Sequence, residues 1–191
     1  MIDQGIKSRP VYERLKIDPT GLRHHLVTDA AAFLSDPFVA GAEGLEVWSV
    51  GSREAEGVTA RPMTEKGRNF RSVQQMLDRL AQRLEHEQMG LRLYAAGREE
   101  FLWDVHGIAQ RAGMGKREIF LTHFGSQARR VHCVHCQTFN ERVTTTIVRC
   151  DGCGANLFVR DHFSRRLSAF MGVKVDAEVP GDVPSAEQAY L

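Results

Sequence analysis

The four cysteines of the chain form two closely spaced pairs. Cys133 and Cys136 make the first pair, and Cys150 and Cys153 make the second after a gap of 13 residues. Each CxxC pair supplies two sulfurs from one tight turn, and two such turns provide the four thiolates that structural zinc binds at tetrahedral corners. Disulfide staples would be spread along an exported chain. The spacing therefore predicts a structural Zn²⁺ ion held by all four cysteines.

The residues around these pairs are typical of a zinc ribbon. Gly152 and Gly154 allow a sharp turn at the second pair, and the β-branched run 144–148 between the pairs favours a strand. With four thiolates available, we expect His132 and His135 to lie outside the ligand set. One iron ion in a rubredoxin-like site remains the alternative, although Gln137 stands where such sites usually have glycine.

The elements that precede the cysteines alternate between strands and helices. Strands are predicted at 45–51, 91–97 and 119–125, and each runs into glycine. Helices are predicted at 71–88 and 99–112, where apolar residues recur every three or four positions. This order is typical of an α/β fold, in which helices cover a small Rossmann-like parallel sheet. The ribbon follows it.

Other parts of the chain carry weaker patterns. Residues 11–12 and 23–27 are compatible with short strands, 30–34 with a helical turn, and 52–68 with a loop or mobile segment. Beyond the second pair, 163–171 has an amphipathic helical pattern. We therefore expect three parts: an α/β domain with an N-terminal extension at 1–128, a zinc ribbon with its following helix at 129–173, and an acidic tail at 174–191.

No catalytic or nucleotide-binding motif accompanies this pattern. Neither G-x-G-x-x-G nor G-x-x-x-x-G-K-[ST] follows a predicted strand, and 113–115 follows a helix. We therefore assign no catalytic and no cofactor-binding residues, and expect the sheet to be a scaffold. His24 and His25 would point to opposite faces of a strand, so we expect them at the surface rather than as a ligand pair.

Charge and hydropathy limit the classes of partner. The 191 residues carry a formal net charge of +1, which does not indicate a nucleic-acid or anionic-membrane partner. No apolar run is long enough for a membrane span, and residues 1–5 lack a secretory signal pattern. A cytoplasmic location is therefore expected. A nucleic-acid-binding ribbon would need a basic face, and it stays as an alternative.

The segments 131–136, 150–157 and 159–173 together resemble a known family. They are similar to the small DmmA-like subunit of bacterial dimethylamine monooxygenase, and the resemblance extends over the whole chain. It implies an NADPH-dependent, multi-subunit system that demethylates dimethylamine oxidatively to methylamine and formaldehyde. It also implies partner subunits that carry haem, flavin and iron–sulfur groups, with haem on the catalytic subunit.

The segment 91–124 is also similar to the nucleotide-binding modules of ferredoxin reductases. Those modules have Cys-Gly-Pro after the strand, whereas this chain has Ala-Ala-Gly at 95–97, without a glycine-rich phosphate loop. We therefore expect an accessory subunit that binds neither NADPH nor flavin itself. Its docking surface is expected at 157–173, where large apolar residues alternate with arginines.

Overall fold

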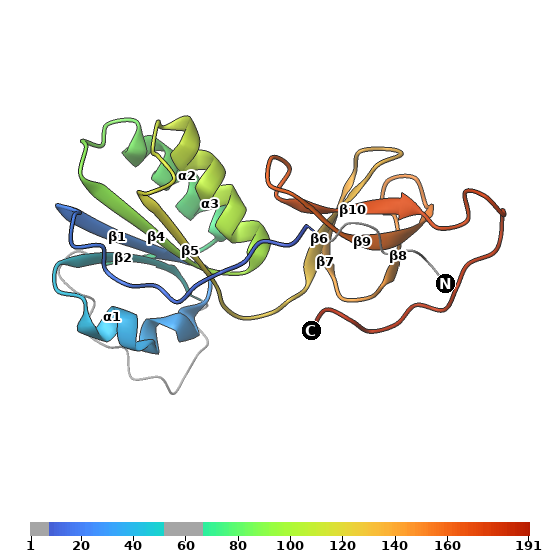
Figure 1. Ribbon diagram of the computed structural model, residues 1–191, viewed down its shortest axis with the longest axis horizontal. Helices are drawn as coiled ribbons and strands as arrows, with labels where there is room; N and C mark the ends of the chain where they lie inside the picture. The colour runs from blue at the N-terminus through green and yellow to red at the C-terminus, as the bar shows by residue number, and fades with distance from the viewer. Residues whose placement is uncertain (1–7, 52–66) are drawn as a thin grey trace. The chain divides into compact units, whose positions relative to one another are not determined.

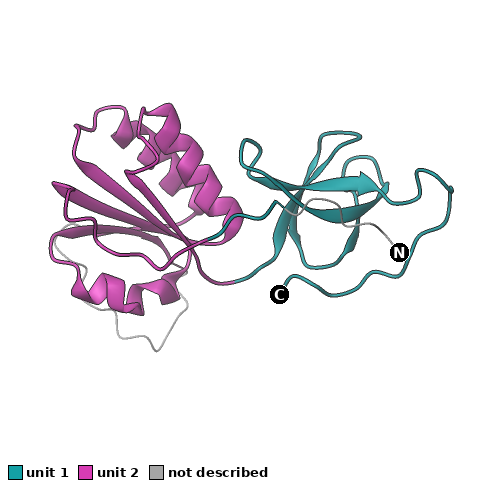
Figure 2. Ribbon diagram, in the orientation of Figure 1, with its two compact units in different colours: residues 1–11, 126–191 teal, residues 12–125 magenta. Residues whose placement is uncertain are grey.

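The computed structural model describes residues 8–51 and 67–191. The chain separates into two compact units, one made of residues 12–125 and the other of residues 1–11 and 126–191 (Figure 2). Most of the loop expected at 52–68 lies outside the described residues. Within the described ranges, none of the helices has the length and apolar character that crossing a bilayer requires.

The first unit is built on a five-stranded sheet in the order β3-β2-β1-β4-β5 (Figure 1). All of its strand pairs are parallel. The strands are β1 (Arg23–Thr28), β2 (Leu45–Val50), β3 (Arg68–Phe70), β4 (Leu91–Gly97) and β5 (Ile119–His123). This order places β1 beside β4, and the order in which successive strands are added to the sheet reverses there, as in Rossmann-like folds. The predicted α/β class with a parallel sheet is confirmed.

Helices cover both faces of this sheet (Figure 1). α2 (Val73–Leu84) and α3 (Glu99–Arg111) lie on one face, and the short η1 (Ala31–Ser35) and α1 (Pro37–Gly41) lie on the other. The apolar face predicted for α2 is buried against the sheet through Met76 and Leu80, which are fully buried. Ser72 caps this helix because its hydroxyl accepts from the backbone N–H of Gln75.

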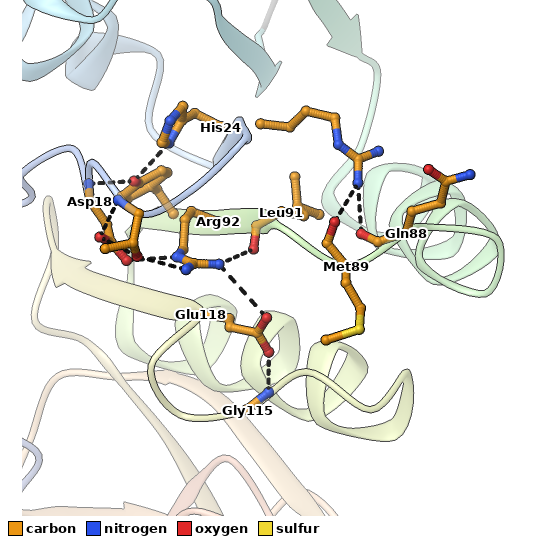
Figure 3. Close-up of polar contacts among 11 residues, drawn as sticks. Asp18, His24, Gln88, Met89, Leu91, Arg92, Gly115 and Glu118 are labelled. Atoms are coloured by element: carbon orange, nitrogen blue, oxygen red, sulfur yellow. Dashed lines mark hydrogen bonds and ion pairs between the residues drawn. The ribbon is translucent and has the colours of Figure 1, made fainter.

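A polar network holds the segment before β1 against the start of β4 (Figure 3). Arg92 Nε lies 2.6 Å from the Asp18 carboxylate, and a second Arg92 nitrogen donates to Thr20 Oγ1. The Asp18 backbone N–H donates to the Tyr94 hydroxyl, which also contacts His24. Hydrogen bonds from the Arg92 side chain, and then from the backbone N–H and hydroxyl of Thr20, lower the pKa of the Asp18 carboxyl to about 2. The 18–21 turn is thereby fixed to the strand.

The second unit contains a five-stranded sheet in the order β7-β6-β10-β9-β8. Its strands are β6 (Arg129–Cys133), β7 (Phe139–Val143), β8 (Ile147–Arg149), β9 (Asn156–Ser164) and β10 (Ala169–Lys174). All neighbours are antiparallel except β6 and β10, which are parallel. This is the C-terminal, cysteine-bearing sheet expected after the parallel one.

The helix expected at 163–171 is absent, and this prediction was wrong. The segment instead forms the end of β9, a tight turn and the start of β10. Ser168 turns the chain with a φ of 50°. Phe163 and Phe170 then face each other across the two strands, with ring centroids 5.0 Å apart. The apolar spacing that resembled a helix is thus a cross-strand pair.

This rearrangement also removes the reason for a docking surface at 157–173. Leu157, Phe163 and Phe170 are at most 5% exposed, and the unit buries them itself. It can do so because β9 and β10 extend its sheet to five strands.

The residues after β10 return to this sheet. The backbone N–H of Ala189 and that of Tyr190 both donate to the Thr144 carbonyl, and Gln188 pairs with Thr145. Tyr190 is 9% exposed, and Arg129 lies over its ring at 3.7 Å and over the Phe170 ring at 3.9 Å. Tyr190, within the expected acidic tail, therefore belongs to the core of the unit.

Candidate metal centre

The two cysteine pairs lie in two turns that have the same backbone hydrogen bonds. The Cys133 N–H donates to the Thr138 carbonyl, and the Gln137 N–H donates back to the Cys133 carbonyl. In the second turn, the Cys150 N–H donates to Ala155 and the Gly154 N–H donates back to Cys150. The first turn joins β6 to β7 and the second joins β8 to β9. We call them the first and second knuckles.

The knuckles bring all four sulfurs into one cluster. The Sγ atoms of Cys133, Cys136, Cys150 and Cys153 lie within 4.8 Å of one another. The Cys136–Cys150 pair is 3.5 Å apart and the Cys133–Cys153 pair is 4.0 Å apart. Four thiolates at about 2.3 Å from a tetrahedral Zn²⁺ would be about 3.8 Å apart. The donor set and its spacing fit one metal ion.

Both knuckles need a residue with positive φ after the second cysteine. Gly154 has φ 72°, and Gln137 has φ 65° in the equivalent place. The absence of glycine in the first knuckle therefore changes the strain of the turn and not its shape. Gly152 is required for a different reason, because a Cβ there would lie 2.1 Å from Thr138 Oγ1.

Asn140 joins the two knuckles, and no sequence pattern singles it out. This side chain is 1% exposed. Its Oδ1 accepts from the Asp151 N–H, while its Nδ2 donates to the Val131 carbonyl and lies 3.8 Å from Cys150 Sγ. An asparagine at the start of a strand next to a turn is ordinary, so its type and position do not distinguish it from a surface residue.

The sulfurs differ in how well their negative charge is stabilised. Hydrogen bonds from the Thr138 side chain and backbone lower the pKa of the Cys136 thiol to about 6. Burial raises the pKa of Cys150, but N–H groups of Cys153 and Gly152 outweigh it and lower that pKa. Although the Ala155 N–H acts to lower the pKa of Cys153, burial and the neighbouring sulfurs raise it to about 11. Four thiolates here need a cation.

The two histidines of the first knuckle do not join the sulfur cluster. Within the described part of the chain, the only group of potential ligands gathered at this spacing is the four cysteines. His132 packs against Phe139 with ring centroids 5.1 Å apart, and His135 is exposed.

His24 and His25 lie on opposite faces of β1, but the expected surface position is wrong for His25. It is fully buried, and neither ring nitrogen has a hydrogen-bond partner among residues 8–51 and 67–191. Its ring lies edge-on to Trp48 at 4.6 Å. Burial, and then the charge of Arg83, lower its pKa to about 3. His25 is a neutral core residue.

The carboxyl edge of the parallel sheet shows what stands in place of a phosphate loop. Between β1 and β4, the Asp29 carboxylate is 1% exposed and pairs with Arg98 at 2.8 Å. A Cβ on Gly97 would lie 1.8 Å from Asp29 Oδ1. Glu99 and Glu100 occupy the first turn of α3, where a phosphate would otherwise be attracted. This end of the sheet therefore carries three carboxylates, and Arg98 pairs with two of them, Asp29 and Glu100.

Comparison with known proteins assigns the chain to a family. Residues 4–119 match the N-terminal domain, and residues 130–173 the C-terminal domain, described as "dimethylamine monooxygenase subunit DmmA-like". The chain belongs to the DmmA-like family. The resemblance found in the sequence is therefore confirmed.

A curated relative of this DmmA-like chain is the heme-dependent oxidative N-demethylase delta subunit of Ectopseudomonas mendocina (strain ymp). The two are 39% identical over 112 residues, which cover 59% of this chain and 64% of that protein. The chain thus spans under two thirds of the length of this relative. No solved structure matches this chain.

Proposed function

We propose that this chain is a non-catalytic subunit of a multi-component oxidative N-demethylase and that its four cysteines hold one structural zinc ion. The observation that carries the proposal is the match of both of its domains to the DmmA-like family. The name of the curated relative, a delta subunit of a heme-dependent oxidative N-demethylase, supports a place in a complex.

The proposed metal role rests on the residues of the knuckles. Cys133 and Cys136 lie at the end of β6 and in the turn after it. Cys150 and Cys153 lie in the turn between β8 and β9, so one ion would cross-link the two edges of the sheet. Zinc supplies such a cross-link without redox chemistry. Thr138 and the knuckle N–H groups stabilise the thiolates that would hold it.

We further propose the reaction of the whole complex. Its substrate is dimethylamine, which it demethylates with NADPH to methylamine and formaldehyde. The haem lies on the catalytic subunit, and flavin and iron–sulfur groups lie on reductase components. The Asp29–Arg98 pair and the acidic start of α3 support the assignment of NADPH and flavin to partners rather than to this chain. The complex is cytoplasmic, with no nucleic-acid or membrane partner.

The test is isolation of the native complex through a tag on this chain. Its subunits are identified by mass spectrometry and its metals by elemental analysis. We expect a haem-containing partner, and about one zinc per copy of this chain beyond the haem and iron–sulfur iron. Omission of the chain should abolish amine-dependent NADPH oxidation in the reconstituted mixture.

Separate results bear on the metal and on the assembly. Stoichiometric iron in the isolated chain, with a red colour, would indicate a rubredoxin-like electron carrier instead of a structural zinc site. Purification without a haem protein would contradict the subunit role itself. A salt-sensitive shift of DNA or RNA would instead point to nucleic acid.

A further inference from the structure

The sulfurs of the metal centre differ in their access to solvent. Cys133 and Cys150 are 0% and 3% exposed, and Cys136 is partly buried. Cys153 alone among the four is classed as exposed. Of the four cysteine residues, Cys153 is thus the one that a reagent in solution reaches most readily.

A hollow gives small molecules a route to Cys153. It has a volume of about 360 Å³ and opens to solvent. Its walls come from both knuckles, the start of β9 and the end of β10 with the residues after it: His135, Cys153, Gly154, Ala155, Asn156, Lys174 and Asp176. The lining is polar, so water and a water-sized oxidant can enter. We call it the Cys153 hollow.

Hydrogen bonding adds to this difference between the sulfurs. Cys150 Sγ receives the N–H groups of Gly152 and Cys153 and lies 3.8 Å from the Asn140 amide. Cys136 Sγ is bonded by the side chain and backbone of Thr138. Each such bond withdraws electron density from a thiolate and weakens it as a nucleophile. Cys153 Sγ receives one backbone N–H, that of Ala155, so fewer donors act on it than on Cys150 or Cys136.

We propose that Cys153 is the oxidant-reactive ligand of this centre, and that its oxidation by hydrogen peroxide forms a Cys133–Cys153 disulfide and opens the metal site. The inference rests on the metal centre of the proposed function. It adds a modification site, Cys153, and a chemical signal, hydrogen peroxide. Such a peroxide is released when oxygen is reduced without demethylation of the substrate.

The chemistry consists of two balanced steps. The Cys153 thiolate attacks one oxygen of hydrogen peroxide, the O–O bond breaks, and sulfenic acid and hydroxide are formed. The Cys133 thiolate, whose sulfur lies 4.0 Å away, then attacks the Cys153 sulfur and displaces hydroxide. The two sulfurs together lose two electrons, which the peroxide gains. Two thiolates remain, one in each knuckle, too few to retain a structural ion.

The experiment follows metal and thiols in the same full-length sample. Metal content is measured first, and the chain is then treated with substoichiometric hydrogen peroxide or N-ethylmaleimide. Mass spectrometry locates the modified cysteine, while a chromophoric chelator records released metal. We expect N-ethylmaleimide on Cys153 first, a Cys133–Cys153 disulfide after peroxide, and release of about one metal ion per disulfide.

A matched pair of variants tests the role of the hollow. His135→Trp places a large side chain at its wall, whereas His86→Trp makes the same change at an exposed position in the other unit. The rate of Cys153 alkylation should fall about threefold or more in the first variant and stay unchanged in the second.

The outcomes separate this inference from the proposed metal centre. A chain purified without metal would overturn both. A metal-loaded chain in which Cys136 reacts first, or in which all four cysteines react together, would overturn only the inference. So would a metal-loaded chain that keeps its ion after peroxide.

Discussion

Gln137 shows how one residue can be strained within a well-formed turn. It has the left-handed backbone conformation that Gly154 has in the second knuckle, with φ values of 65° and 72°. An L-residue with a side chain loses about 1 kcal/mol in that conformation relative to glycine. The first knuckle is therefore less stable than the same turn would be with glycine at position 137.

Gln137→Gly is expected to raise metal affinity by about fivefold, because it relieves about 1 kcal/mol of strain in the bound form. Gly154→Ala should lower affinity by a similar factor. Competition with a chromophoric chelator measures both. Gln127→Gly, at an exposed residue outside the positive-φ set, is the matched control and should change nothing. Equal affinities for Gln137→Gly and the parent chain would contradict the strain argument.

His25 predicts a pH dependence of the parallel-sheet unit. Its pKa is about 3 in the folded chain, against an ordinary value of 6.5, because burial disfavours the charged ring. Between these two pKa values, the unfolded chain therefore binds a proton at His25 that the folded chain does not bind. The contribution of His25 to the free energy of unfolding is fully present above pH 6.5. It decreases as the pH falls towards 3, and about 2 kcal/mol is lost at about pH 5.

His25→Phe should reduce that loss. Urea unfolding of the variant and the parent chain, at about pH 7.5 and about pH 5, gives the difference. His86→Phe replaces an exposed histidine and should keep the parental pH dependence. If His25→Phe loses as much stability between these pH values as the parent, the buried ring is not the cause.

At the scale of elements, the sequence was sufficient where amphipathic patterns were long. β4 was predicted at 91–97 and lies there, and α3 was predicted at 99–112 and ends at Arg111. α2 is shorter than predicted because its polar ends lie outside the helix, and β5 ends at His123, two residues before the predicted end. The helices bury one face each, which is what their periodicity records, whereas the central strand β4 is buried on both faces and reads as a continuous apolar run.

Short elements were missed because their partners are distant in the chain. β3 has three residues and is a strand because it pairs with β2, and α1 has five residues and begins with the Asp36 cap. The strand suggested at 11–12 did not form, and the bridge in that region is at Ser8, with His162. The four cysteines were predicted, whereas Asn140 becomes visible only when both knuckles are placed together.

The carboxyl edge of the parallel sheet predicts poor nucleotide binding. Asp29 and the two glutamates at the start of α3 would repel the phosphates of NADPH or FMN. Calorimetric titration of the isolated chain should show no saturable binding below about millimolar concentration. A micromolar Kd for either ligand would contradict this prediction.

At the scale of the whole molecule, two units with separate sheets imply two stabilities. One unit is held by apolar packing of α2 and α3, and the other carries the four cysteines. Metal binding should stabilise only the second, because ligands bound to the folded form add their binding energy to its folding.

Calorimetry of the full chain should therefore show two transitions, and removal of the metal with a chelator should lower only one. Cys150→Ser should reproduce that shift without a chelator, because it deletes one of the four sulfurs. Hydrogen exchange assigns the affected transition to β6–β10. A single transition that moves as a whole after chelation would show that the units unfold together.

The placement of the tryptophans in one unit determines which events an optical measurement detects. Both tryptophans of the chain, Trp48 and Trp103, lie in residues 12–125, and both are buried there. Intrinsic indole emission consequently reports the parallel sheet and gives no signal of its own from the cysteine-bearing sheet. A fluorescence assay could thus find this protein intact after its metal has been lost.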